Sequence, residues 1–431
     1  EVGAENARRI VAERCLYGVD LNPLAVELAK LSLWLVTLSK GRPFGFLDHN
    51  LRCGDSLLGI SHLDQLTELS VSPKEQTQGR LFGKSIRQAV KEALAIRLQL
   101  RGMPIRDIRD VEAVASLDVA ARTKITTSEC IADAFIGLVF VAENAEDLER
   151  RLATIGPDVD RAVQGNESAL GSLLRLADDS LRVGFLDERK GVPFHWPLEF
   201  PEVFLREHPG FDAFIGNPPF LGNRLWRGTQ GPSLRRIVEL VLKVPPGKID
   251  LSVAFHRRAA DLLRVNGGYG LLATNNIAEG SAVSVGLEQI AGQGNFYFAK
   301  KGLPWPGAAS TVVAIVCFTK GNWTGHRLCD GVACDRIGPR LEPAVAGGWE
   351  PKPLADALFA FAGVDNSKGL SFVITEKHPW FECLRSERDS LLRPYITGND
   401  ITSTALRRVE RWALDIGDLS LEAVARKWPL S

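Results

Sequence analysis

The sequence lacks a net charge and lacks a disulfide framework. Its 431 residues include 52 Lys or Arg and 52 Asp or Glu, so no overall field draws the chain to nucleic acid. A local basic cleft remains compatible with this balance. The seven cysteines are odd in number and scattered, which excludes the pattern of a small disulfide-bonded secreted domain and favours a reducing compartment.

The chain also lacks an uninterrupted apolar run of membrane length. The best candidate, Leu24 to Leu38, contains Glu27 and Lys30 and is too short to cross a bilayer. No signal peptide is recognisable, so we expect a cytoplasmic protein without a membrane partner. The length allows two to four domains with large cores.

Cysteine and histidine residues also lack the spacing of a zinc site. Four potential ligands occur between residues 317 and 334, but their spacing fits no paired Cys-x-x-Cys scheme, and the first lies inside a strand pattern. We therefore expect no metal site. The four residues are Cys317, His326, Cys329 and Cys334.

What the sequence does contain is centred on residues 211–222, FDAFIGNPPFLG. The apolar run Phe211–Ile215 is long enough for a buried strand of a parallel sheet, and Gly216 ends it. Pro218 and Pro219 then fix φ at two successive positions and remove two N–H donors. The strand must therefore stop there and the backbone must extend.

Two hydrogen-bond acceptors follow this strand without an obvious donor nearby. They are the side-chain oxygen of Asn217 and the carbonyl oxygen of Pro218, and Phe220 adds an aromatic ring beside them. Two acceptors and a flat ring suit a planar group that carries an exocyclic NH2. An ordinary Pro-Pro turn next to a core phenylalanine is the alternative, and these four residues alone leave it open.

A second candidate lies where a predicted strand meets a predicted helix. Ala4–Glu13 is expected to be helical, and the strand Cys15–Val19 delivers Asp20. Asn22 is a favourable N-cap, Pro23 suits the first helical position, and leucines at three- and four-residue steps predict an amphipathic helix. An acid at a strand end before a helix is how dinucleotide-binding sheets hold ribose hydroxyls. A solvated turn acid is the alternative.

A third candidate is the short glycine-bounded segment RCGDSLLG, residues 52–59. It offers Asp55, followed by Ser56 and the apolar pair Leu57 and Leu58. A turn acid before a helix is again the alternative.

Together these segments resemble the motifs of S-adenosylmethionine-dependent amino-methyltransferases, mainly the N6-adenine DNA methyltransferases. NPPF matches their NPP(Y/F) catalytic motif, and GVDLNPLAVELAKLSLWL, residues 18–35, resembles their second cofactor motif. The context FDAFIGNPPFLG is similar more narrowly to the large methylase subunits of type II restriction–modification systems. Later segments, GYGLLATNNIAEG and LPWPGAASTVVAIVCFTKG, also resemble this family.

The resemblance implies methyl transfer from S-adenosyl-L-methionine to the N6 amino group of adenine in duplex DNA, in a restriction–modification or phage-defence system. It assigns Asp20 to the ribose of the cofactor and Asp55 to its adenine amino group. The implied catalytic residues are Asn217, Pro218, Pro219 and Phe220. The implied cofactor-binding residues are Asp20, Leu21, Asn22, Asp55, Ser56 and Leu57.

The implied fold class is α/β, with a Rossmann-like class I methyltransferase sheet that is incomplete at its N-terminus. Residues 1–61 are expected to carry the cofactor motifs, and residues 62–190 a helical insertion with breaks near Gly156, Pro157 and Gly165. Residues 191–341 are expected to form the catalytic part. Residues 342–431 are expected to begin a target-recognition region.

One element of the family is missing. A cofactor pocket of this type needs a Gly-rich turn after a first strand, and no strand–Gly-x-Gly–helix unit precedes Asp20. The sequence begins with Glu rather than Met, so we expect it to be part of a longer protein that carries this unit upstream. By itself the chain is then expected to bind the cofactor weakly.

Residues 223–264 hold nine Lys or Arg against three acids. Such an excess beside a catalytic motif suits DNA phosphates, although a basic solvent face is the alternative for any single residue. The candidate nucleic-acid-binding residues are Arg224, Arg227, Arg235, Arg236 and Lys248. His195 and Trp196, among prolines and aromatics, are expected to be structural.

Two other functions remain open from sequence. The first is methylation of RNA or of a protein amide, since NPP(Y/F) suits any planar amino group. The second is a DNA-binding module that has lost cofactor binding, which the missing Gly-rich turn favours. A nuclease is not visible, so a restriction nuclease would be a separate partner or a fused domain outside this sequence.

Overall fold

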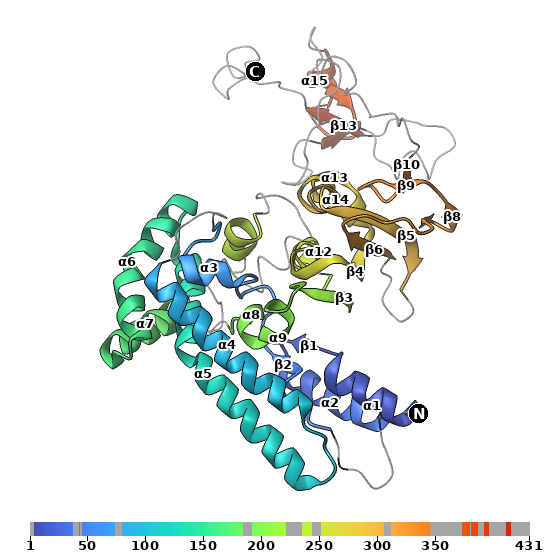
Figure 1. Cartoon of the computed structure of the whole chain (residues 1–431). Helices are drawn as coiled ribbons and strands as arrows, with labels where there is room; N and C mark the ends of the chain where they lie inside the picture. The colour runs from blue at the N-terminus through green and yellow to red at the C-terminus, as the bar shows by residue number, and fades with distance from the viewer. Residues whose placement is uncertain are drawn as a thin grey trace. The chain divides into compact units, whose positions relative to one another are not determined.

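The chain forms two compact units, residues 1–349 and residues 350–431. No helix in the described ranges is long and apolar enough to cross a membrane. The computed structural model (Figure 1) describes residues 4–37, 43, 45–73, 80–183, 192–220, 235–243, 251–305, 312–344, 373–379, 381–386, 392–395 and 411–414.

The first unit begins with a small parallel sheet between helices. Its two strands pair with Gly18 opposite Leu51 and Asp20 opposite Cys53. The predicted N-terminal helix is confirmed, and the strand is shorter than predicted. The elements are α1 (Ala4–Arg14), β1 (Gly18–Asp20), α2 (Pro23–Val36) and β2 (Leu51–Cys53).

Helix α2 starts as the sequence predicts, but its leucine-rich face is exposed. The Asn22 side chain accepts a hydrogen bond from the Leu24 N–H at 3.0 Å, and Pro23 takes the first position. Lys30 is buried instead, where its Nζ lies 2.6 Å from Asp48 Oδ1. The leucines Leu24, Leu28, Leu31 and Leu35 are 45–64 % exposed.

The described residues between 63 and 180 form a helical layer (Figure 1). The predicted break at Gly156 and Pro157 is wrong, because α6 continues through both. A buried stripe that includes Leu152 and Val159 packs this helix against its neighbours, and that packing offsets the cost of an interior proline. The helices are α3 (Leu63–Glu68), α4 (Leu81–Gly102), α5 (Ile108–Val141), α6 (Ala145–Val163) and α7 (Glu167–Ser180).

A mixed sheet forms the other half of the first unit, in the order β10-β9-β5-β6-β4-β3. β3 and β4 pair in parallel, and β6 pairs antiparallel with both β4 and β5. The α/β prediction is confirmed to this extent, whereas β5 was not predicted. The main strands are β3 (Phe211–Gly216), β4 (Leu263–Thr274), β5 (Gly294–Pro304) and β6 (Val312–Lys320).

Short elements complete the first unit. The short strands β7 to β10 extend the sheet beyond β5, and α12 leads directly into β4. The strands are β7 (Leu328–Cys329), β8 (Val332–Ala333), β9 (Arg336–Ile337) and β10 (Pro343–Ala344). The helices are α8 (Trp196–Glu199), α9 (Pro201–Phe204), η1 (Ile237–Val241), α12 (Leu251–Leu262), η2 (Asn275–Ala278), α13 (Gly280–Ala282), η3 (Val283–Leu287) and α14 (Glu288–Ala291).

An aromatic cluster connects the two sheets of the first unit. Tyr17, next to β1, contacts Phe200 at 4.9 Å and Phe211 of β3 at 5.6 Å between ring centroids. Trp196 contacts Phe211 at 5.7 Å. Among the described residues β1 pairs only with β2, and β3 only with β4, so one edge of each strand is unpaired. Ile215 of β3 is 93 % exposed.

The second unit contains a three-stranded antiparallel sheet with β13 in the centre. Ile374, Phe381 and Leu392 form its small core, with Trp412 packed against them. The elements are β11 (Val373–Thr375), α15 (Phe381–Ser386), β12 (Leu392–Pro394) and β13 (Arg411–Leu414).

Two buried histidines give the first unit a predictable pH dependence. Burial lowers the pKa of His49, with help from the Arg97 charge, to about 4, and burial lowers the pKa of His256 to about 3. Below the ordinary value of 6.5 the unfolded chain therefore binds protons that the folded chain does not. Stability from these groups is complete above pH 6.5 and decreases as the pH falls towards these lowered values.

We expect the free energy of unfolding to drop by about 2 kcal/mol per histidine between pH 7 and pH 5. Urea unfolding of the wild type and of His256→Gln at both pH values measures this drop. In His256→Gln this drop should be smaller by the contribution of His256, whatever the stability of the variant at pH 7. An equal drop in both proteins would contradict the assignment.

Candidate active site

Asn217 to Phe220 follow the carboxyl end of β3. The strand ends at Gly216, which lies opposite Leu271 of the parallel strand β4, and the chain then continues without regular structure. Asn217 is exposed and Pro218 is buried. Neither the Asn217 side-chain oxygen nor the Pro218 carbonyl accepts a hydrogen bond from another described residue. Neither acceptor is therefore engaged within the part of the chain that the structure describes.

Phe220 lies beside an aromatic residue that the sequence did not single out as part of the site. Its ring centroid is 6.1 Å from that of Trp305, and the two planes meet at 84°. Trp305 directly follows β5, which the sequence did not predict. Its sequence signals were the proline on each side, Pro304 and Pro306, and its place in the segment LPWPGAASTVVAIVCFTKG, which resembles the family.

Asp20 lies at the carboxyl end of β1, with its side chain exposed. One carboxylate oxygen, Oδ1, accepts a hydrogen bond from the Asn22 N–H at 2.7 Å. The other, Oδ2, has no partner among the described residues. Leu21 is also exposed, whereas the Asn22 side chain is engaged in capping α2.

Asp55 is brought close to Asp20 by strand pairing. The Gly54 N–H donates to the Asp20 carbonyl at 3.0 Å, and the Asp55 N–H donates to the Val192 carbonyl at 2.9 Å. Asp55 Oδ1 accepts the Leu57 N–H at 3.0 Å. Burial raises the pKa of Asp55, and the Leu57 N–H and the Arg258 charge oppose that rise. The structure thus joins the two predicted cofactor motifs.

Leu57 has its side chain buried in the core, and its contact with the cofactor stays a prediction. Its contribution to this site is the N–H that holds Asp55. Ser56 is half-buried, and its carbonyl accepts a hydrogen bond from Trp196 Nε1 at 3.1 Å. Among the described residues, no hydrogen bond or ring contact joins Asn217–Phe220 to Asp20 or Asp55.

The segment before the catalytic strand holds the Asp55 loop in place. The Trp196 N–H donates to the Ile60 carbonyl at 3.1 Å. His195 is buried, with Nδ1 3.5 Å from the Ile60 N–H and Nε2 3.1 Å from Asp133 Oδ1. A Cβ on Gly59 would lie 1.6 Å from the Phe194 carbonyl oxygen, so only glycine fits there. Both His195 and Trp196 thus have structural contacts.

The predicted basic surface is only partly described. Arg235 Nε lies 2.5 Å from Glu239 Oε1, and Arg236 Nη1 donates to the Glu143 carbonyl at 2.5 Å. Both side chains are half-buried. Arg258, counted in the basic excess, is 2 % exposed and therefore cannot meet a phosphate at the surface. Arg224, Arg227 and Lys248 lie outside the described residues.

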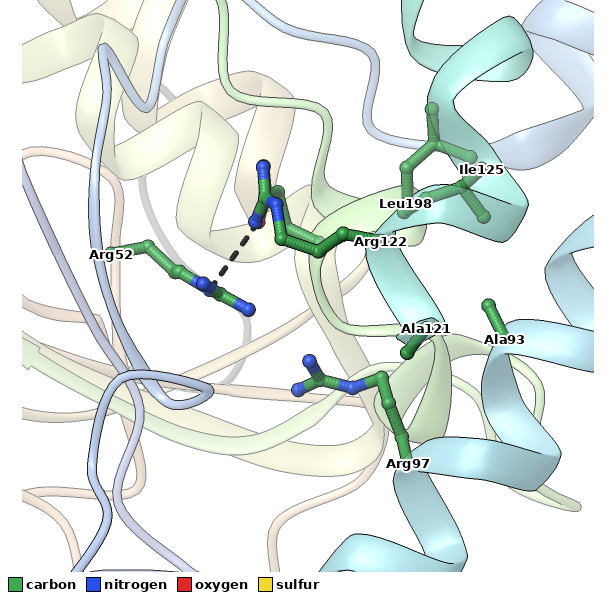
Figure 2. Close-up of a pocket in the computed structure, with 8 residues that line it drawn as sticks. Arg52, Ala93, Arg97, Ala121, Arg122, Ile125 and Leu198 are labelled. Carbon is green, nitrogen blue, oxygen red and sulfur yellow. Dashed lines mark hydrogen bonds and ion pairs between the residues drawn. The ribbon is translucent and has the colours of Figure 1, made fainter. Parts of the chain in front are cut away.

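A network of ion pairs attaches the helical layer to β2. Figure 2 shows Arg52 of β2, Arg97 of α4 and Arg122 of α5 converging on one small pocket. Asp118 of α5 lies 3.0 Å from Arg52, and Arg122 lies 3.0 Å from Glu199. β2 leads to Asp55, so these ion pairs attach the helical layer to the strand that precedes the Asp55 loop.

Further contacts in this network join α4 to α9. Arg97 Nη2 lies 2.6 Å from Glu202 Oε1. Burial pushes the pKa of Glu202 up, but the hydrogen bonds and charge of Arg97 more than offset this, so that pKa is lowered.

A comparison with known protein families matches the part of the chain that carries the candidate site. The model of the Eco57I restriction-modification methylase family matches residues 14–288. The chain belongs to this family. The matched range contains the Asp20, Asp55 and Asn217 segments of the candidate site. Trp305 and the second unit lie beyond it.

One relative is a Methanocaldococcus jannaschii protein named as a candidate type II restriction enzyme and methyltransferase. It is 26 % identical over 283 residues, which are 62 % of this chain and 22 % of that protein. The chain therefore corresponds to about a fifth of the length of this relative.

Solved structures give weaker matches. The type IIL restriction-modification enzyme MmeI, solved in complex with DNA, has a TM-score of 0.36 at 15 % identity, over 80 % of this chain and 50 % of that one. The type IIG restriction endonuclease BpuSI has a TM-score of 0.23 at 12 % identity, over 63 % and 38 %.

Proposed function

We propose that this chain carries the catalytic part of a DNA methyltransferase that transfers a methyl group from S-adenosyl-L-methionine to the N6 amino group of adenine in duplex DNA. The observation that carries the proposal is the pair of acceptors on Asn217 and Pro218 at the end of β3, in a chain of the Eco57I methylase family. The class I methyltransferase fold and the adenine specificity are part of the proposal.

The two acceptors suit the chemistry of an aromatic amine. The N6 lone pair of adenine is delocalised into the ring and is a poor nucleophile. Asn217 Oδ1 and the Pro218 carbonyl each accept one N6 hydrogen, which favours a tetrahedral nitrogen and orients its lone pair. This is catalysis by orientation and electrostatic preorganisation, without a strong base.

Phe220 and Trp305 supply aromatic surface beside these acceptors. Stacking a base on Phe220 is worth about 1–3 kcal/mol. Extruding a base from duplex DNA costs a few kcal/mol, so stacking offsets much of that cost. A phenylalanine in the place of tyrosine retains the ring that stacks.

The carboxylates of Asp20 and Asp55 fit a nucleoside-containing cofactor. Each uses Oδ1 on a local backbone N–H, and Oδ2 of the exposed Asp20 has no described partner. We assign Asp20 to ribose hydroxyls and Asp55 to the adenine amino group of S-adenosylmethionine. The bound cofactor supplies the electrophilic methyl group.

The expected Gly-rich unit has a natural place next to these residues. β1 and β3 each have an edge without a partner among the described strands, and α2 exposes its leucines. An unpaired edge of a parallel strand and an exposed apolar helix face are both unfavourable in water. We propose that a strand–turn–helix unit upstream of residue 1 covers them.

The DNA contacts are also proposals. Arg224, Arg227, Arg235, Arg236 and Lys248 are assigned to phosphates, and the second unit to target recognition. We further propose that the system includes a restriction nuclease, as a partner or as a domain outside this sequence.

Methyl transfer from labelled S-adenosylmethionine tests the function. The substrates are unmethylated duplex DNA, single-stranded RNA and a protein extract, and the chain of 431 residues is used both alone and with the expected upstream unit added. We expect label only in DNA, recovered as N6-methyladenine, and more with the extended chain. Label in RNA or protein, or no label with DNA still bound, would overturn the proposal.

A further inference from the structure

The loop that carries Asp55 is held by a buried arginine from a distant part of the chain. Arg258 lies on α12, and its Nη2 donates to the Leu57 carbonyl at 2.8 Å and to the Gly59 carbonyl at 3.0 Å. These pairs are 201 and 199 residues apart in sequence. The arginine therefore holds two carbonyls of the loop backbone with a single nitrogen.

The guanidinium of Arg258 makes few hydrogen bonds for a group that is so deeply buried. Arg258 is 2 % exposed, and its Nε and Nη1 have no hydrogen-bond partner among the described residues. Burial lowers the pKa of Arg258. Buried N–H groups without partners cost free energy, and an apolar side chain of similar volume often stabilises a fold as well as a buried charge does. Stability alone therefore does not account for an arginine here.

The helix that carries Arg258 also holds the segment after the loop. Asp261, one turn further along α12, lies 2.8 Å from Nε2 of His62. α12 leads directly into β4, which pairs with β3 and so positions Asn217. Contacts to the loop thus come from an element that is joined to the catalytic strand.

We propose that Arg258 is a positioning residue for the cofactor. Its two hydrogen bonds set the backbone of residues 57–59, which in turn holds the Leu57 N–H against Asp55, and they connect the cofactor loop to the catalytic sheet. This inference rests on the proposed role of Asp55 in binding S-adenosylmethionine.

The charge of Arg258, like the Leu57 N–H, also stabilises the ionised form of Asp55. Burial alone raises the pKa of Asp55, while the Arg258 charge and the Leu57 N–H lower it. The arginine thus favours the ionised carboxylate, which is the form that only accepts hydrogen bonds and suits an amino group.

The test compares three variants with the wild type. Arg258→Met removes the two hydrogen bonds and the charge. Arg257→Met is the matched control, because Arg257 is the adjacent residue on α12 and also donates to two carbonyls, those of Val285 and Leu242, which are not in the loop. Asp55→Ala tests the proposed function separately. The dissociation constant for S-adenosylmethionine is measured by calorimetry, and the amide hydrogen exchange of residues 57–59 by mass spectrometry.

We expect Arg258→Met to raise the dissociation constant about tenfold and to speed exchange in the loop, with turnover at saturating cofactor within about threefold of wild type. Arg257→Met should change neither the affinity nor the loop exchange. If Arg258→Met folds and binds S-adenosylmethionine as tightly as the wild type, while Asp55→Ala binds it more weakly, only the role of Arg258 is overturned. All four proteins carry the upstream unit proposed above, and with it no binding by the wild type, or unchanged affinity in Asp55→Ala, would overturn the cofactor assignment and this inference together.

Should Arg258→Met not fold, Arg258→Lys takes its place, since lysine keeps the charge but lacks the planar fork. We expect a rise in the dissociation constant of about threefold. Wild-type affinity and loop exchange in Arg258→Lys would overturn the proposal that these hydrogen bonds position the loop.

Discussion

Replacing Asn217 with alanine is expected to lower methyl transfer by at least about 10²–10³-fold, the range found when one preorganised polar group is removed from an active site. The side-chain oxygen has no described partner, so its loss leaves no buried group unpaired and should not unfold the protein. The affinity for S-adenosylmethionine should stay within about twofold, because Asp20 and Asp55 are unchanged. Single-turnover transfer of labelled methyl to duplex DNA measures the effect.

Asn166→Ala is the matched control for this substitution. The Asn166 side chain caps α7 by accepting the Ala169 N–H at 3.0 Å, so its loss should cost about 1 kcal/mol of stability and leave transfer intact. Transfer by Asn217→Ala at the rate of Asn166→Ala would rule out the catalytic assignment.

Replacing Gly59 with alanine is expected to cost more than about 4 kcal/mol of stability, or to prevent folding. The added Cβ would lie 1.6 Å from the Phe194 carbonyl oxygen and 2.9 Å from the His195 nitrogen. Both atoms belong to the backbone, so relief requires the loop to separate from the segment that precedes the catalytic strand. Urea unfolding, followed by circular dichroism, measures the loss.

Gly102→Ala provides the comparison, because a Cβ at the end of α4 meets no atom within 4 Å. Alanine also favours the helix by about 1 kcal/mol relative to glycine. Gly102→Ala should thus be as stable as the wild type or more so. Equal stability of the two variants would show that the loop and residues 194–195 are not packed as described.

Several features of the site could be predicted from short stretches of sequence. The end of β3 follows from Pro218 and Pro219, because proline restricts φ and removes the N–H that a strand needs. The start of α2 follows from Asn22 and Pro23, which satisfy the first turn locally. In each case the interacting atoms are only a few residues apart.

Other features depended on contacts that the sequence does not display. Arg258 belongs to a basic stretch by sequence, yet its position on α12 buries it against the Asp55 loop. Leu57 was expected at the cofactor, but the core covers its side chain. Trp305 could be found beside Phe220 only after β5, which had not been predicted, was placed in the sheet.

The sequence by itself determined the candidate groups of the proposed site: two acceptors and a ring after one strand, and an acid at or just after the end of each of two others. These follow from covalent geometry and local hydrogen bonding. Only the tertiary structure decided which leucines of α2 stay exposed, that α6 passes through Pro157, and that Gly59 must be glycine. Those outcomes depend on packing between residues far apart in the chain, which no local pattern encodes.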